Sequence, residues 1–175
     1  MLVSSREIHR GRVVHLFEDT VVLPNGNTTT LDMIRHPGAA AVVPFLDSRT
    51  ILLVRQFRHA AGGNLLEVPA GKLDAGDTPE ACAARELEEE AGRRARRLEK
   101  LGSIFTTPGF TDEVIHLFAA FDLEPVPTRH EHDEVIELVP MRLSHALDLV
   151  WQGTLRDAKS ALALIHAARH VGRLK

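Results

Sequence analysis

The chain contains 175 residues, of which 44% are hydrophobic and 26% are charged, with a net charge of -3. This length allows one domain with a well-buried core, residues 1–175, and is short for two. Charges of both signs are mixed along the chain, which argues against nucleic acid as a partner, and no apolar run approaches the ~20 residues that cross a bilayer. The single cysteine, Cys82, excludes an internal disulfide, so we expect a soluble cytoplasmic protein.

The first half of the chain is predicted to be mainly β-sheet. Within residues 13–35, β-branched runs lie on both sides of the sequence NGN, which is a strong hairpin signal. A second pair of β-rich runs flanks a polar turn at residues 47–49. A shorter strand follows in LLEVPAG, residues 65–71, and ends on Pro69 and Gly71.

A helix is clearly marked between Thr78 and Gly92. Thr78 is a candidate N-cap, Pro79 occupies the first helical position, and Gly92 lies just past the end. Four elements are predicted after it: strands at residues 114–123 and 134–141, then helices at 143–153 and 157–170. Strands and helices are interspersed without regular βαβ alternation, which favours a mixed α/β (α+β) sandwich over a doubly wound parallel sheet.

Acidic side chains gather at the end of the first predicted helix, in the run RELEEEAG. At about 100° per residue, Glu86, Glu89 and Glu90 fall within an arc of ~100°, whereas Glu88 points roughly the opposite way. A helix C-terminus carries partial negative charge, so each exposed carboxylate there costs roughly 0.3 to 1 kcal/mol. A run of Glu is usually a solvated face, but here only Arg85 can compensate at the i,i+4 spacing. A hard divalent cation would supply the missing charge.

The segment that contains this helix resembles the signature of the Nudix hydrolase family, G-x5-E-x7-R-E-U-x-E-E-x-G-U, where U is a bulky apolar residue. The positions that match it in register are Gly71, Arg85, Glu86, Leu87, Glu89, Glu90 and Gly92. Two positions depart from it. Asp77 replaces the first Glu, which in the family mainly steadies the loop, and Arg93 replaces the last apolar residue. Neither position is a principal metal ligand in the family.

The resemblance implies a hydrolase that acts on a nucleoside diphosphate linked to another moiety, built as a Nudix-type αβα sandwich on a mixed sheet. Glu86, Glu89 and Glu90 would bind Mg²⁺ or Mn²⁺, with the carbonyl of Ala70 as an additional ligand. Arg85 would orient a glutamate by a charge-assisted hydrogen bond, and Arg85 and Glu89 are assigned to catalysis. Cations that neutralise diphosphate oxygens lower the barrier to attack by water.

Features outside the signature resemble the ADP-ribose pyrophosphatase group of this family. Pro108 lies 16 residues after Gly92 (108 minus 92), which is about the distance that marks the group. The sequence PGFTDE around it, RQFR at residues 55–58 and LEVPAG at residues 66–71 also resemble the group. The substrate-binding residues implied are Arg55, Arg58, Glu67, Pro108, Gly109 and Phe110. Without the resemblance, Pro108 and Gly109 would indicate only a tight turn, and the arginines only surface ion pairs.

The general base is expected in RHEHDEVIEL, residues 129–138, where the group carries a mobile loop with a catalytic glutamate. Glu134 matches this glutamate best. Glu131 and the glutamates of the signature are the alternatives.

The predicted function is Mg²⁺-dependent hydrolysis of ADP-ribose to AMP and ribose 5-phosphate. The resemblance also implies a homodimer that pairs through an N-terminal antiparallel β-region, residues 1–37. Alternatives within the family are cleavage of a nucleotide sugar such as GDP-mannose, or broad specificity. A non-enzymatic alternative is a catalytically silent Nudix domain that senses a nucleotide. The intact RELEEE argues against it, because a sensor does not need a full set of metal ligands.

Overall fold

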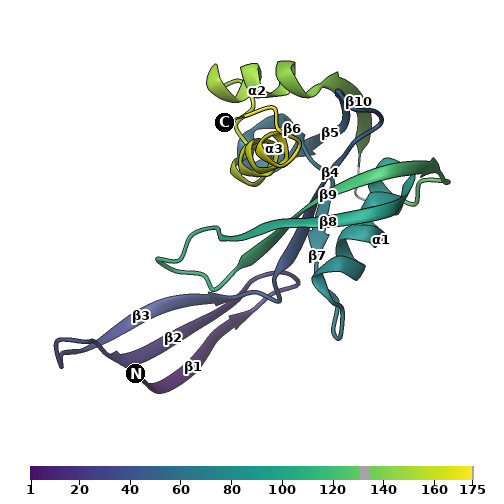
Figure 1. Cartoon of the computed structure of the whole chain (residues 1–175). Helices are drawn as coiled ribbons and strands as arrows, with labels where there is room; N and C mark the ends of the chain where they lie inside the picture. Colours follow the sequence, from purple (N-terminus) through teal and green to yellow (C-terminus); the bar gives the residue numbers. More distant parts are fainter. Residues whose placement is uncertain (131–134, 175) are drawn as a thin grey trace.

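The computed structural model of the chain describes residues 1–130 and 135–174. In these residues the strands form three sheets, and the central one has the strand order β7-β4-β9-β8 (Figure 1). Its strands are β4 (Ala39–Pro44), β7 (Ala70–Lys72), β8 (Arg93–Phe105) and β9 (Val114–Pro125). β4 and β9 run parallel and the other neighbours run antiparallel, so the sheet is mixed, as the sequence predicted.

Helices cover both faces of the central sheet (Figure 1). α1 (Pro79–Ala91) packs against one face, and α3 (Ala158–His170) packs against the other, next to α2 (Leu143–Trp151). Successive side chains of a strand point to opposite faces, so Val43 of β4 packs towards α3 and Val42 packs towards α1. Because both faces are covered, every residue of β4 is buried. The predicted αβα sandwich is confirmed.

The second sheet is antiparallel and consists of β10 (Ile136–Arg142), β5 (Thr50–Arg58) and β6 (Gly63–Glu67), with a short 3-10 helix, η1 (His59–Ala61), between β5 and β6. The predicted polar turn joins β4 to β5, and Oδ1 of Asp47 accepts the N–H groups of Arg49 and Thr50 at 2.7 and 2.8 Å. The two strands nevertheless belong to different sheets. Apolar runs identify strands, but they do not identify the partner of each strand.

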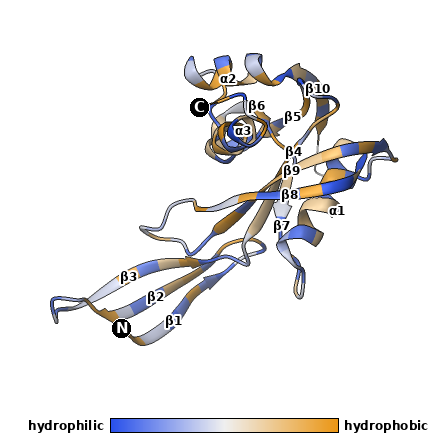
Figure 2. Ribbon diagram, viewed as in Figure 1, coloured by the Kyte–Doolittle hydropathy of each residue, from blue (hydrophilic) through white to orange (hydrophobic). Residues whose placement is uncertain are grey.

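The N-terminal strands form a third, antiparallel sheet, which extends from one end of the sandwich as an arm (Figure 1). These strands are β1 (Leu2–Arg10), β2 (His15–Val22) and β3 (Thr28–Arg35). The predicted hairpin lies between β2 and β3, where Gly26 has a φ of +86°, a conformation that favours glycine. Hydrophobic segments run along the arm (Figure 2). Its exposed apolar residues include Leu2, Val3, Ile8, Val13, Val14, Leu23 and Leu31.

No strand was predicted at the residues of β8, and β1 was predicted only as part of the N-terminal β-region, residues 1–37. β8 reads RRARRLEKLGSIF, and so many arginines would ordinarily indicate a solvated segment. β8 lies at the edge of the central sheet, where Arg96 pairs with Glu124, and Arg97 lies 3.5 Å from Asp122. Cross-strand ion pairs therefore accommodate a polar sequence in a strand. β1 is exposed along its whole length, so no alternation of buried residues marks it.

The three predicted helices are confirmed. α1 spans the residues between the predicted caps Thr78 and Gly92, and Gly153 has a φ of +70° shortly after the end of α2. α3 was predicted at residues 157–170, and it spans Ala158–His170 with Asp157 as its N-cap. None of the helices in the described residues has the length and apolar character needed to span a membrane.

Candidate active site

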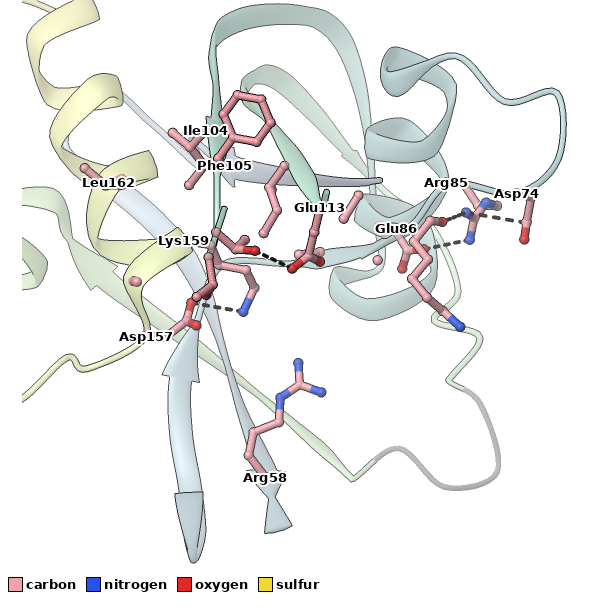
Figure 3. A pocket seen from close by; sticks show the side chains of 18 of the residues that line it. Arg58, Asp74, Arg85, Glu86, Ile104, Phe105, Glu113, Asp157, Lys159 and Leu162 are labelled. Carbon is pink, nitrogen blue, oxygen red and sulfur yellow. Dashed lines mark hydrogen bonds and ion pairs between the residues drawn. The ribbon is translucent and has the colours of Figure 1, made fainter. Parts of the chain in front are cut away.

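A cavity of about 770 Å³ lies between α1 and the first turn of α3 (Figure 3). Side chains from distant parts of the chain line it: Arg58 of β5, Arg85, Glu86 and Glu89 of α1, Ile104 and Phe105 of β8, and Lys159 and Leu162 of α3. Its walls therefore combine carboxylates, basic groups and an apolar surface. A cavity of this size suits a small organic ligand, and the charged side chains of its walls suit polar groups on that ligand.

The position of α1 is fixed at both ends and along its length. Oγ1 of Thr78 accepts the N–H of Ala81 at 3.1 Å. At the other end, Gly92 adopts the left-handed conformation (φ +59°), and its N–H donates to the carbonyl of Glu88 at 3.1 Å. Leu87 is fully buried on the face towards the sheet. The rotation of the helix, and thus the direction of its glutamates, is set by this packing.

The glutamates of α1 point in different directions. Glu86 and Glu89 line the cavity. Glu88 instead accepts a hydrogen bond from Nε of Arg94, at 2.7 Å, at the start of β8. This separation agrees with the helical geometry used to predict the acidic face.

β7 approaches α1 very closely at Gly71. A Cβ at this position would lie 2.0 Å from Oε1 of Glu86, far inside van der Waals contact. At the preceding residue, the N–H of Ala70 donates to Oε2 of Glu90 at 3.0 Å. Glu86 and Glu90 are accordingly buried, with 8% and 3% of their surface exposed. A side chain at residue 71 would occupy the place of the Glu86 carboxylate, so any residue other than glycine would force this carboxylate to move.

Arg85 binds two of the glutamates and the loop before the helix. Its Nη1 lies 2.7 Å from Oε1 of Glu86 and 3.3 Å from Oε2 of Glu89, and its Nη2 donates to the carbonyl of Lys72 at 3.0 Å. Burial tends to lower the pKa of Arg85, but the negative charge of Glu86 and other neighbours raises it further, so the pKa lies above its ordinary value. The guanidinium stays charged and holds both carboxylates.

Asp77, which departs from the family signature, steadies the loop before α1. Its Oδ2 accepts the N–H of Asp74 at 3.2 Å, and its own N–H donates to the carbonyl of Asp74 at 3.0 Å. Oδ2 also lies 3.5 Å from Nη2 of Arg85. The shorter side chain therefore makes the loop contacts that the resemblance assigns to the first glutamate.

The side chains present fit a hard divalent cation. Glu86, Glu89 and Glu90 offer carboxylate oxygens, the donors that Mg²⁺ and Mn²⁺ prefer. Glu86 and Glu89 already share one cation, the guanidinium of Arg85. Within residues 1–130 and 135–174, no three His, Cys, Asp or Glu side chains converge into a formed metal centre. A metal ion would have to draw these carboxylates together, so the ligand set predicted above stays a proposal.

A basic wall at the other end of the cavity contains Arg58 and Lys159 (Figure 3). Both side chains bind the buried Glu67. Nε and Nη2 of Arg58 donate to the two oxygens of Glu67 at 2.8 and 2.9 Å, and Nζ of Lys159 donates to Oε2 at 2.5 Å. Burial tends to raise the pKa of Glu67, but the bonds and charges of Arg58 and Lys159 outweigh it and hold the pKa below its ordinary value. Arg58 and Glu67 are predicted substrate-binding residues, whereas the sequence indicates Lys159 only as part of a helix.

Pro108, Gly109 and Phe110 form a tight turn at one end of the loop between β8 and β9. The N–H groups of Phe110 and Thr111 both lie 3.1 Å from the carbonyl of Thr107. Thr107 lines the cavity, whereas the three predicted substrate-binding residues are exposed and lie outside its lining. A bound substrate would have to extend beyond the cavity to touch them.

Glu113, in the same loop, is a cavity residue that sequence analysis did not assign. Its Oε2 accepts a hydrogen bond from Oγ1 of Thr106 at 2.8 Å, and its Oε1 lies 3.5 Å from Nδ1 of His36. It is the glutamate of PGFTDE, the sequence used above to recognise the substrate group. Nothing in this motif indicates which of its side chains faces the cavity.

The remaining predicted residues lie elsewhere or are not described. Arg55 does not line the cavity, and its Nη1 binds Oε2 of Glu137 at 2.6 Å. Glu134 and its alternative, Glu131, lie outside the described residues. The general base therefore stays a prediction.

The single cysteine is a packing residue. Cys82 is fully buried, and its Sγ lies 3.3 Å from the carbonyl of Lys72. Burial, with a contribution from the charge of Glu86, raises the pKa of the thiol to about 11. The thiol is protonated near neutral pH, which disfavours a role as a nucleophile.

Comparison with known proteins gives consistent matches. Residues 35–161 match the family model described as NUDIX domain. An ADP-ribose pyrophosphatase of Bacillus subtilis (strain 168) is 40% identical over 164 residues, which cover 93% of this chain and 89% of that protein. A methanol dehydrogenase activator of Bacillus methanolicus is 38% identical with the same coverage. A GDP-mannose pyrophosphatase of Cronobacter sakazakii is 39% identical over 142 residues, which cover 75% of this chain and 73% of that protein.

A solved structure described as an ADP compounds hydrolase has the same fold. It superposes with a TM-score of 0.86 and covers 99% of this chain and 96% of its own, at 23% sequence identity. At this identity the likeness concerns the fold, including the N-terminal arm, and not the substrate. The relatives carry different names, so similarity by itself leaves the substrate open.

Proposed function

Because the chain belongs to the Nudix hydrolase family, we propose that it hydrolyses the pyrophosphate bond of ADP-ribose to AMP and ribose 5-phosphate. The observation that carries this proposal is the division of one cavity into an acidic and a basic wall. Glu86 and Glu89, held by Arg85, line one end, and Arg58 and Lys159, with Asp157 bound to Lys159, line the other (Figure 3). The guanidinium and ammonium groups of the basic wall suit phosphate oxygens. The carboxylates of the acidic wall suit a diphosphate only through a bound divalent cation.

Mg²⁺ or Mn²⁺ is the proposed cofactor, in agreement with the hard oxygen donors present. Glu86, Glu89, Glu90 and the carbonyl of Ala70 would hold the ion, which when bound neutralises diphosphate oxygens and acidifies water. Arg85 keeps Glu86 and Glu89 oriented, because its Nη1 contacts both carboxylates. Gly71 leaves room for the Glu86 carboxylate beside the backbone.

Water is the proposed nucleophile, and Glu134 is the proposed general base. A carboxylate that takes a proton from water must lie within hydrogen-bond reach of it in the substrate complex. Glu131 or a glutamate of α1 would take this role if Glu134 does not.

The name of the Bacillus subtilis relative favours ADP-ribose, and the names of several relatives favour GDP-mannose as the second candidate. A panel that contains ADP-ribose, GDP-mannose, UDP-glucose, diadenosine polyphosphates, NADH and dGTP would decide between them. We expect the highest kcat/KM for ADP-ribose. If GDP-mannose or dGTP is cleaved at least tenfold more efficiently, the substrate assignment is wrong, although the pyrophosphatase reaction would stand.

A cytoplasmic homodimer is the proposed state of the protein. The arm formed by residues 1–37 exposes several apolar side chains, and burial against a second subunit would remove them from water. Light scattering at micromolar concentration should give twice the mass of the chain. A monomer mass would refute pairing through the arm.

A further inference from the structure

The N-terminus of α3 is connected to the basic wall of the cavity by several short hydrogen bonds. Asp157 caps the helix, and its Oδ2 accepts the N–H of Ser160 at 2.9 Å and a hydrogen bond from Nζ of Lys159 at 3.0 Å. Oγ of Ser160, which is fully buried, donates to the same oxygen of Asp157 and accepts the N–H of Val68 at 2.8 Å. The first turn of α3 is thereby attached to the backbone that follows Glu67.

Lys159 completes the surroundings of Glu67. Only 1% of the surface of Glu67 is exposed, so its carboxylate depends on protein donors. Oε1 accepts one bond from Arg58, whereas Oε2 accepts one from Arg58 and one from Lys159. Lys159 itself has a side chain that is 17% exposed, and Asp157 fixes its ammonium group.

Arg58 has the most exposed side chain among Arg58, Glu67, Asp157 and Lys159. Its side chain is 40% exposed, and Figure 3 shows the guanidinium pointing into the open space between the two walls. The fork formed with Glu67 uses Nε and Nη2. A planar fork on a fixed carboxylate fixes the plane of the guanidinium, and thus the direction of its remaining N–H groups.

We propose that Lys159 is a positioning residue, which anchors the Glu67 carboxylate so that Arg58 presents its free N–H groups to an oxygen of the bound nucleotide. This inference rests on the proposed function, since it assigns a role at the same cavity. Lys159 acts through Glu67 and does not itself touch the substrate. Loss of Lys159 leaves Oε2 of Glu67 with one donor instead of two, and the guanidinium then loses its fixed direction.

The test compares Lys159→Met and Lys159→Arg with a control variant, Lys100→Met. Lys100 is an exposed lysine of β8 that does not line the cavity. Lys159→Met should raise KM for ADP-ribose by roughly tenfold, the lower end of the effect of a hydrogen bond to a charged group, with kcat within about threefold of wild type. The dissociation constant of ADP-ribose, measured by calorimetry with EDTA present, should rise by the same factor. Lys159→Arg should restore both constants to within about threefold, and Lys100→Met should match wild type.

A second pair of variants tests the route through Glu67. In a Glu67→Gln background, Lys159→Met should change KM and the dissociation constant by less than about twofold, because the anchor is already lost. In the single variant Lys159→Met, the buried carboxylate of Glu67 keeps only Arg58 as a partner, which could prevent folding. Glu67→Gln removes this charge, so the double variant can be measured even if Lys159→Met alone does not fold. A tenfold effect in the Glu67→Gln background would show that Lys159 contacts the substrate directly, and would overturn the positioning role.

Other outcomes separate this inference from the proposed function. If Lys159→Met lowers the unfolding temperature but leaves KM and the dissociation constant unchanged, Lys159 is only structural and the inference is wrong. If wild-type protein binds ADP-ribose but does not hydrolyse it, the proposed function fails, and the binding data still decide the role of Lys159. A wild-type protein that does not bind ADP-ribose overturns both.

Discussion

Gly71 and Glu86 are so close that any side chain at residue 71 would overlap the Glu86 carboxylate: a Cβ would lie 2.0 Å from Oε1 and 2.2 Å from Cδ. Gly71 has no positive φ, so the feature that favours glycine here is this close approach. The backbone of β7 at Gly71 therefore lies directly against the Glu86 carboxylate of α1, although the two residues are separated along the chain.

Gly71→Ala should displace Glu86 and lower kcat by at least ~10-fold, because an electrostatic contact in the transition state is lost or misplaced. The unfolding temperature should fall less than expected for a core defect, since the carboxylate can move towards the cavity. Gly63→Ala is the matched control, because its Cβ would meet nothing within 4 Å and its φ is not positive. Equal activity of the Gly71 and Gly63 variants would contradict the account of this contact.

The glutamates of α1 should differ in importance. Glu89→Gln should lower turnover by ~10² or more, a typical scale for the loss of a transition-state electrostatic contact. Glu88→Gln should stay near wild type, because Glu88 binds Arg94 away from the cavity. Steady-state kinetics with saturating Mg²⁺ would measure both, and similar losses at the two positions would mean that the acidic face is misassigned.

Glu134 is predicted to act in turnover and not in folding, since a carboxylate in a polar segment has little apolar surface to bury. Glu134→Gln should keep the thermal stability and most of the substrate affinity of wild type while hydrolysis slows. Single-turnover kinetics together with a melting curve would check this. Normal turnover would transfer the role of base to Glu131 or to a glutamate of α1.

The pKa of Glu67 makes the folded state sensitive to acid. Its folded pKa is depressed below the ordinary value of 4.5, because Arg58 and Lys159 outweigh the effect of burial. A depressed pKa contributes stability above the unfolded value, and this contribution is lost as the pH falls through the folded pKa. The free energy of unfolding of wild type should therefore fall more steeply below about pH 4.5 than that of Glu67→Gln. Parallel curves from urea titrations at several pH values would rule this out.

Local signals in the sequence were sufficient for α1 and its acidic face. Thr78, Pro79 and Gly92 are neighbours of the helix they delimit, and the direction of Glu88 follows from helical periodicity. The hairpin at Gly26 is equally local. Elements of this kind need no knowledge of the rest of the chain.

Contacts between distant residues were not predictable in the same way. Glu67 and Lys159 are separated by 92 residues, and nothing near Lys159 in the sequence indicates that its ammonium meets a buried carboxylate. The strand β8 was missed because two of its arginines, Arg96 and Arg97, pair with carboxylates of β9 that only the sheet brings near. Ion pairs between residues that are distant in the chain produce no periodic pattern in a single sequence.

The most direct test of the account is the release of AMP from ADP-ribose by wild-type protein in ¹⁸O-labelled water, with Mg²⁺, with EDTA, and with Mg²⁺ restored. We expect equal amounts of AMP and ribose 5-phosphate with Mg²⁺, ¹⁸O in only one of the two products, no release with EDTA, and recovery when Mg²⁺ is restored. Glu89→Gln should release at least ~10²-fold less product under the same conditions. Release that persists in EDTA, or that is unaffected by Glu89→Gln, would contradict metal-dependent hydrolysis at the carboxylates of α1.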